Sequence, residues 1–236
     1  MILNQAQKAL RKRANKVKAI GAARFFKTAP GEYGYGDQFI GVTVPDTRLI
    51  ANEFKDLSLN EIKVLLYSNI HEDRLLALII LVNQSIKAQK NRDIESVKKI
   101  ARFYEKNWTQ VNNWDLVDTS AKNILGPVYF QKSILPLLKM IRSKNMWIRR
   151  IGVLTTFYFI GKNDFQPTLY LCEKLLDDDQ DLIHKATGWA LREVGKKDEK
   201  VLLKFLDKFA TKMPRTMLRY SIEKLSPIQM KHYMST

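Results

Sequence analysis

The sequence predicts an all-α protein built as a helical-repeat solenoid, and three observations lead to this prediction. Apolar residues recur three and four positions apart from about residue 45 onward, which is the spacing of one face of a helix. Short turns containing Gly, Pro, Asn or Asp separate these segments. Two of the segments also resemble each other at a separation of 35 residues. No stretch shows the alternation that is typical of a half-buried strand.

The expected helices are clearest over residues 75–82, 148–154 and 182–190. Turns are expected at 126–127, 161–164 and 195–198. The apolar stripes consist of Leu75, Leu78, Ile79 and Val82; of Ile148, Ile151, Val153 and Leu154; and of Leu182, Ile183, Ala186, Trp189 and Ala190.

A faint repeat links three of these segments. "MWIRRIGV" aligns with "DLIHKATG" so that Arg150 falls over Lys185, and "EDRLLALI" places Arg74 76 residues before Arg150. A period of about 35–40 residues with two helices in each unit is typical of a solenoid. We therefore expect one domain over residues 1–236, with a concave basic groove. Arg74, Arg150 and Lys185 should lie along one side of that groove.

The charge predicts a polyanionic partner. Forty Lys and Arg against 24 Asp and Glu give a net charge of +16. Residues 1–27, expected as a basic helix or a flexible arm, contain no acid, and neither do residues 132–162. This segregation favours a nucleic-acid-binding face over a merely solubilising excess of charge. Lys27, in the first of these blocks, is one of the expected DNA contacts.

Several other classes of protein are disfavoured. No apolar run is long enough to span a membrane, and the single Cys172 excludes internal disulfides, so we expect a cytosolic protein. The Gly/Pro-rich residues 28–45 form either a plain loop or the edge of the groove, and they lack the ending of a P-loop. His71, His184 and His232 are scattered, so neither a metal site nor a cofactor is expected.

Three segments have residues suited to chemistry. Trp114 and Asp118 are four apart in "NNWDLVD", so an indole and a carboxylate share one helix face. Asn113 or Asp115 is a candidate cap for that helix. The alternative is a core tryptophan and a capping aspartate.

The other two segments are "WIRR" and "KATGWALRE". Arg149 and Arg150 are adjacent, so one can face the groove while the other faces solvent. Gly188 is expected to leave room for a partner beside the indole of Trp189, although a buried tryptophan is the ordinary alternative.

Together, "NNWDLVD", "WIRR" and "KATGWALRE" resemble the AlkD family of bacterial DNA alkylation repair glycosylases, over most of the chain. The resemblance implies HEAT-like repeats. It also implies release of N3- and N7-alkylated purines from duplex DNA without base flipping. It assigns catalysis to Asp118, sugar contact to Trp114 and Trp189, a backbone grip to Arg150, and further DNA contacts to Arg48 and Arg192.

The implied chemistry suits these residues. An alkylated purine leaves readily and leaves behind an oxocarbenium-like sugar, which an anionic Asp118 and the two indole faces would stabilise. No lysine is placed as a Schiff-base nucleophile, so we expect a monofunctional enzyme. We also expect it to be monomeric and to need no cofactor. Its expected location is the bacterial cytosol, in association with the nucleoid. The alternatives are a non-enzymatic DNA-binding solenoid and a protein-binding scaffold.

Overall fold

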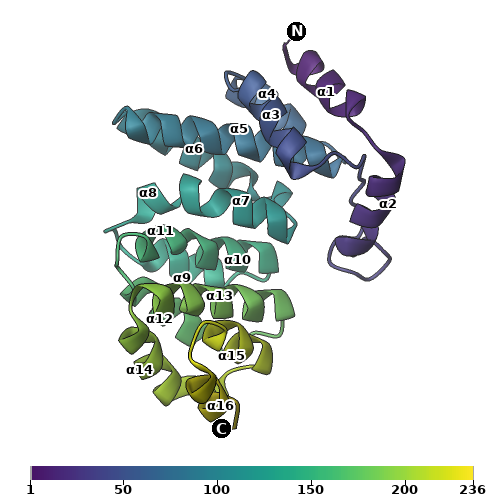
Figure 1. Cartoon of the computed structure of the whole chain (residues 1–236). Coiled ribbons are helices and arrows are strands. Elements are labelled where there is room, and N and C mark those ends of the chain that lie inside the picture. The colour runs from purple at the N-terminus through teal and green to yellow at the C-terminus, as the bar shows by residue number, and fades with distance from the viewer. Residues whose placement is uncertain (1, 236) are drawn as a thin grey trace. The chain divides into compact units, whose positions relative to one another are not determined.

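The computed structural model describes residues 2–235, which divide into two units with the boundary between Ile124 and Leu125. The first unit contains α1 (Ile2–Lys12), α2 (Lys16–Phe25), α3 (Val44–Glu53), α4 (Leu59–Leu66), α5 (His71–Lys90), α6 (Ile94–Asn107), η1 (Trp108–Gln110) and α7 (Trp114–Ile124) (Figure 1). The second contains α8 (Gly126–Tyr129), α9 (Leu135–Ile141), α10 (Met146–Thr155), α11 (Phe157–Ile160), α12 (Gln166–Lys174), α13 (Asp181–Lys197), α14 (Glu199–Phe209), η2 (Ala210–Lys212), α15 (Arg215–Ile222) and α16 (Pro227–Ser235).

Helix α5 is the centre of the first unit. It packs against α3, α4, α6 and α7. Residues 71–82 are buried without interruption, because neighbours cover α5 on every side along its first three turns. The predicted stripe over residues 75–82 is therefore correct but understates how much of the helix is core. Each buried Leu or Ile side chain stabilises the fold by about 1.5–3 kcal/mol.

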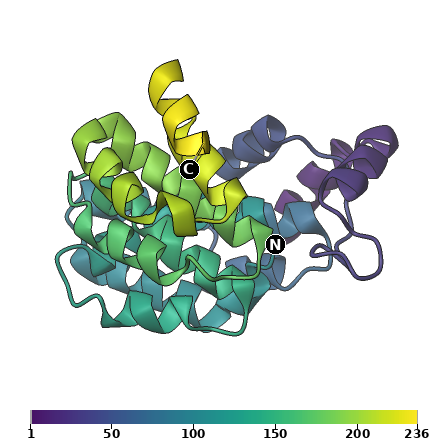
Figure 2. The ribbon, with the colours of Figure 1, turned by 90° about the horizontal axis from the view of Figure 1, so that it is seen from below.

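The basic N-terminal block forms two helices, α1 and α2. Helix α1 is anchored by the buried Ala6 and Leu10. Helix α2 begins after Asn15, whose side chain caps it, and contains no buried residue. In both views α1 and α2 lie beside one end of the other helices of this unit (Figures 1 and 2).

The Gly/Pro-rich loop between α2 and α3 is held by a buried carboxylate. Glu72, in the first turn of α5, accepts hydrogen bonds from the main-chain N–H groups of Ile40, Gly41 and Val42, at 3.1, 2.7 and 3.2 Å. Gly41 has a φ of +79°, and a Cβ there would meet the carbonyl oxygen of Asn15 at 2.1 Å. The loop is therefore built to pass close to the start of α2.

The second unit consists of helix pairs. Helix α10 packs on α9, α13 packs on both α12 and α14, and α13 also packs on α10 and α15. A Cβ at Gly188 would meet the Met217 carbonyl oxygen at 2.5 Å and the Tyr220 Cβ at 2.6 Å. Gly188 thus allows α13 and α15 to approach closely. It does not leave room for a partner beside Trp189, which corrects the prediction.

The repeat is present, and its register differs by one residue from the prediction for the first copy. Arg74, Arg149 and His184 are each the fourth residue of their helix, and each contacts the carbonyl oxygen six residues earlier in the chain. Arg74 is therefore equivalent to Arg149, and only Arg150 and Lys185 correspond as predicted. We call this recurring contact the side-chain clasp.

The loop beneath each clasp is closed in the same way. Three residues before the helix, Ser68, Ser143 or Asp178 accepts a hydrogen bond from the N–H group two positions later. Asp178 also binds Arg149 through two hydrogen bonds of 2.7 and 3.1 Å. The loop closures repeat at the same spacing as the clasps, which supports the corrected register.

The all-α prediction is confirmed, because residues 2–235 form helices and turns with no strand beyond an isolated bridge between Gln38 and Ile70. Within these residues no helix is both long and apolar enough to cross a membrane. The concave basic groove remains a prediction.

Candidate functional site at the start of α7

The N-terminus of α7 begins at Trp114, where the sequence predicted it. The Asn113 side-chain oxygen accepts a hydrogen bond from the Trp114 N–H at 2.8 Å, and an Asp115 carboxylate oxygen accepts one from the Leu116 N–H at 2.8 Å. Both predicted capping residues therefore bind main-chain donors. A helix N-terminus also favours negative charge.

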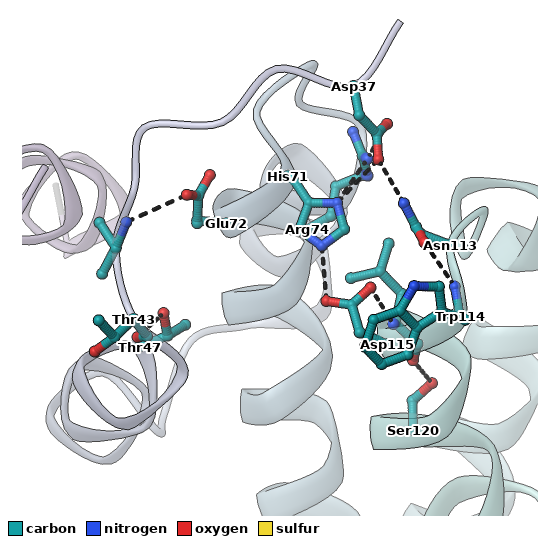
Figure 3. A network of polar contacts seen from close by, with 12 residues as sticks. Asp37, Thr43, Thr47, His71, Glu72, Arg74, Asn113, Trp114, Asp115 and Ser120 are labelled. Atoms are coloured by element: carbon teal, nitrogen blue, oxygen red, sulfur yellow. Dashed lines mark hydrogen bonds and ion pairs between the residues drawn. The ribbon is translucent and has the colours of Figure 1, made fainter. Parts of the chain in front are cut away.

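A buried histidine lies between two carboxylates beside this helix start. His71, at the start of α5, contacts Asp37 through Nδ1 at 2.9 Å and Asp115 through Nε2 at 2.8 Å. Arg74 donates to the other oxygen of Asp37 at 2.5 Å, and the Asn113 amide donates to Asp37 at 3.1 Å. Figure 3 shows the imidazole between the two carboxylates. The network joins the loop, α5 and α7.

The network favours the charged form of its members. Burial lowers the pKa of His71, but hydrogen bonds to Asp115 and Asp37 outweigh it and the net pKa is raised. Burial likewise opposes the ionisation of Asp37. The hydrogen bond from His71 and the charge of Arg74 are stronger, so the pKa of Asp37 is lowered. Two carboxylates, a guanidinium and an imidazole are thus enclosed together.

Aromatic rings connect His71 to Trp114. Phe39 stacks on the imidazole with ring centroids 4.5 Å apart, and Phe26 stacks on Phe39 at 5.0 Å. Phe26 also stacks on the Trp114 indole at 5.2 Å, with an angle of 16° between the planes. Phe25, which is 65% exposed, meets the same indole edge-on. The indole is therefore held on one side by residues of the α2 end.

A cavity of about 220 Å³ lies beside this network. Phe26, Phe39, His71 and Asp115 contribute to its lining, and Lys18 of α2 lines it as well. The lining is therefore largely aromatic and apolar, with the carboxylates of Glu72 and Asp115, the Lys18 ammonium and the His71 imidazole as its charged or titratable groups.

Asp118 lies one turn beyond Trp114 on α7, and both side chains are partly exposed. Both residues therefore lie on α7 as expected, and their pairing in one site remains a prediction. The buried Tyr104 hydroxyl, which contacts Ser120 at 2.9 Å, lies within the electrostatic reach of Asp118.

In the second unit, Trp189 is partly exposed on α13. Its ring meets Phe157 edge-on at 4.6 Å, and its Nε1–H donates to Glu193 at 3.1 Å. Lys196 donates to the same Glu193 oxygen at 2.7 Å. The indole orientation is thus fixed by a carboxylate one turn along the helix.

The arginines and the lysine that the sequence singled out in the second unit already have protein partners. Arg150 is 5% exposed and donates to the Leu182 carbonyl oxygen, and Arg149 binds Asp178. Neither side chain extends freely into solvent, which corrects the expectation for the pair. Arg192 binds Glu223, and Lys185 binds Asp181 at 2.8 Å.

In the first unit, Arg48 and Lys27 are exposed, and the Lys27 ammonium lies 5.9 Å from the Tyr33 ring centre. Arg74 is different, since it is 4% exposed and binds Asp37 and the Ser68 carbonyl oxygen. A buried, ion-paired guanidinium does not present itself to a phosphate. We therefore assign Arg74 to the network and omit it from the proposed DNA contacts.

The His71 network was not predicted from the sequence. Asp37 and Asp115 lie 34 and 44 residues from His71, so no local spacing connects them. Two features of the sequence could have pointed to it. They are Asp115, which directly follows Trp114, and Asp37 within the Gly-rich loop. Among the described residues no group of His, Cys, Asp and Glu is arranged to hold a metal ion.

These features define a helical-repeat protein with a polar and aromatic site at a helix start. The family profile of the DNA alkylation repair enzymes matches residues 6–225, and the chain belongs to that family. A predicted DNA alkylation repair enzyme from Enterococcus faecalis has a similar solved structure. It is 15% identical, with a TM-score of 0.69 over 91% of this chain and 98% of that chain. A comparison with curated proteins gives no match.

Proposed function

We propose that this protein is a monofunctional DNA glycosylase that excises cationic N3- or N7-alkylated purines from duplex DNA without base flipping. The observation that carries the proposal is the pair formed by Trp114 and Asp118. They lie one turn apart on α7, partly exposed, in a chain of the DNA alkylation repair family. The proposed setting is the bacterial cytosol, with the protein acting on DNA as a monomer.

The reaction needs stabilisation of a cation rather than protonation of a leaving group. Alkylation places a positive charge on the purine, so the base departs with the electron pair of the N-glycosidic bond. The sugar is left as an oxocarbenium ion with its charge on C1′ and the ring oxygen. An anionic Asp118 near that sugar stabilises the charge and orients the water whose oxygen bonds to C1′. The water's surplus proton passes to Asp118 or to solvent.

The tryptophans supply the apolar part of the site in this proposal. The face of an indole ring attracts a cation, and the attraction grows as the sugar develops positive charge. Phe26 covers one face of Trp114, so the other face is the one we assign to the sugar. Trp189 has the same role by the family resemblance. Arg48, Lys27 and Lys185 are the proposed contacts to the DNA backbone, and Arg150 and Arg192 join them in this proposal only by leaving the Leu182 carbonyl oxygen and Glu223.

The decisive experiment measures release of 7-methylguanine from methylated duplex DNA. The native protein is compared with Asp118→Asn at equal DNA occupancy, with Asp56→Asn as a matched control at an exposed carboxylate. We expect release by the native protein and the control, and a loss of about 10²-fold or more in Asp118→Asn with binding unchanged. Tight duplex binding by the native protein without release of any methylated purine would favour the non-enzymatic DNA-binding solenoid.

The salt dependence of DNA binding distinguishes a protein-binding scaffold from both the glycosylase and the non-enzymatic DNA-binding solenoid. It predicts affinity for an acidic protein and little salt-dependent binding to DNA. The charge of +16 and the acid-free first 27 residues favour DNA as the partner.

A further inference from the structure

We propose that His71 is a positioning residue, whose imidazolium, held between Asp37 and Asp115, fixes the start of α7 and so places Trp114 and Asp118 for reaction. The proposal rests on the proposed glycosylase function and names a residue that acts through others rather than on the substrate. Its support comes from the contacts of the His71 ring, the charges around it, its connections to the main chain of α7 and its ring contacts toward Trp114.

The contacts of the His71 ring determine its protonation state. Ionised carboxylates only accept hydrogen bonds, and His71 contacts one through each ring nitrogen, at 2.9 and 2.8 Å. Both nitrogens must then donate, so the ring has two protons and a positive charge. The ring is 1% exposed, which removes water as an alternative partner. The raised pKa of His71 agrees with this assignment.

Charged groups from several elements surround the His71 ring. The loop contributes Asp37, α7 contributes Asp115, and α5 contributes Arg74, which also binds Asp37. The remaining neighbours are Lys18 of α2, which lines the adjacent cavity, Glu72, whose carboxylate holds the loop amides, and Asp73, which binds Arg11 of α1. Asp37 and Asp115 balance His71 and Arg74, so the neutral ring would leave the enclosed group with an excess negative charge.

Hydrogen bonds connect the network to the main chain of α7. Asn113 donates to Asp37 and accepts from the Trp114 N–H, while Asp115 binds His71 and accepts from the Leu116 N–H. The residues on both sides of Trp114 are therefore tied to the same histidine network. A shift of the network moves the first turn of α7.

Stacked aromatic rings connect the network to the indole of Trp114. Phe39 stacks on His71, and Phe26 stacks on both Phe39 and Trp114. The imidazole is thus linked to the indole by rings as well as by hydrogen bonds. A displacement of about 1 Å at a reacting group can cost as much as 10²-fold in rate.

The test replaces His71 by Gln, which has no charge and cannot donate to both carboxylates in the same way. His232→Gln is the matched control, because His232 is an exposed histidine of α16. The first readout is the single-turnover rate of 7-methylguanine release at saturating protein, set against the Kd for the same duplex. We expect His71→Gln to slow release by about tenfold to 10²-fold while Kd changes by less than about threefold.

A double-mutant cycle separates positioning from general damage to the fold. In a Trp114→Ala background the same His71→Gln change should cost clearly less than in the native background, because one of the two groups that it positions is already absent. An equal loss in both backgrounds overturns the proposal. If His71→Gln does not fold, Asp115→Asn takes its place, since it weakens the same network at a 13% exposed side chain.

The pH profile gives an independent readout. The native release rate should fall as pH rises through the raised pKa of His71, and His71→Gln should lack this fall. A purely structural role for the residue would leave the shape of the profile unchanged.

A measurement without DNA keeps this proposal distinct from the proposed function. The emission of Trp114 is obtained as the difference between the native protein and Trp114→Phe, and it is followed from pH 5.5 to 9 in both histidine backgrounds. We expect it to titrate only when His71 is present. Titration without base release by the native protein would mean that the glycosylase proposal fails and the positioning role stands. Release without titration overturns the positioning role alone.

Discussion

At the residue scale, buried carboxylates organise the first unit. Glu72 holds three consecutive main-chain amides of the loop, Asp37 binds three side chains, and Asp73 binds Arg11 of α1. Each is bound by several donors, which compensates for the cost of burying a charge. These residues determine where the loop and the N-terminal helices lie.

Replacement of Glu72 by Ala should lower the free energy of unfolding by about 3 kcal/mol, because it leaves buried amide groups without an acceptor. The comparison is with Glu53→Ala, which removes the same group from an exposed position and should change stability by less than about 0.5 kcal/mol. Urea unfolding followed by circular dichroism measures both. Equal stability of the two variants would contradict this role of Glu72.

At the element scale, the sequence predicted the helices well because their apolar stripes are local. Ile151, Val153 and Leu154 are buried as their spacing indicates. The loop and its partners were not predictable in this way, since His71 meets its two carboxylates only through the tertiary fold. The register of Arg74 was predicted one residue off, because the equivalence of Arg74 and Arg149 depends on where their helices begin and not on similarity of the surrounding residues.

Close packing of α13 on α15 gives the prediction at this scale. Gly188→Ala should destabilise the protein by about 1–3 kcal/mol, because the new methyl group meets main-chain atoms of α15 that cannot move aside. Gly21→Ala is the control, since it lies within α2 with nothing within 4 Å of the added atom. That change should instead raise stability by about 0.5–1 kcal/mol through helix propensity. Urea midpoints of both variants decide the matter, and a stable Gly188→Ala would mean that the helices can separate without cost.

At the scale of the whole molecule, the net charge of +16 and the exposure of several cations predict binding to DNA that depends on salt. The exposed Lys27 and Arg48 are the proposed contacts of the first unit. They differ from Arg74, whose charge is already neutralised within the protein.

Removal of Lys27 and Arg48 together, each by Ala, should reduce the slope of log Kd against log salt by about 2, because each phosphate contact contributes about 1. Lys90→Ala is the control. It removes an exposed cation at the far end of α5, about 30 Å from His71 along a 20-residue helix. Duplex binding between 50 and 200 mM salt measures the slopes. An unchanged slope in the double variant would place the phosphate contacts on other residues.

The side-chain clasp has a consequence for engineering. Because Arg74, Arg149 and His184 each reach the carbonyl six residues back, the loop and the first helical turn form one cassette with its closure built in. A chimaera joined outside the segment from that carbonyl to the clasp residue carries the closure with it, whereas a join inside the segment separates its two halves. We therefore expect exchanged repeats to keep their closures when the joints lie outside these segments, and the helix starts show where those joints belong.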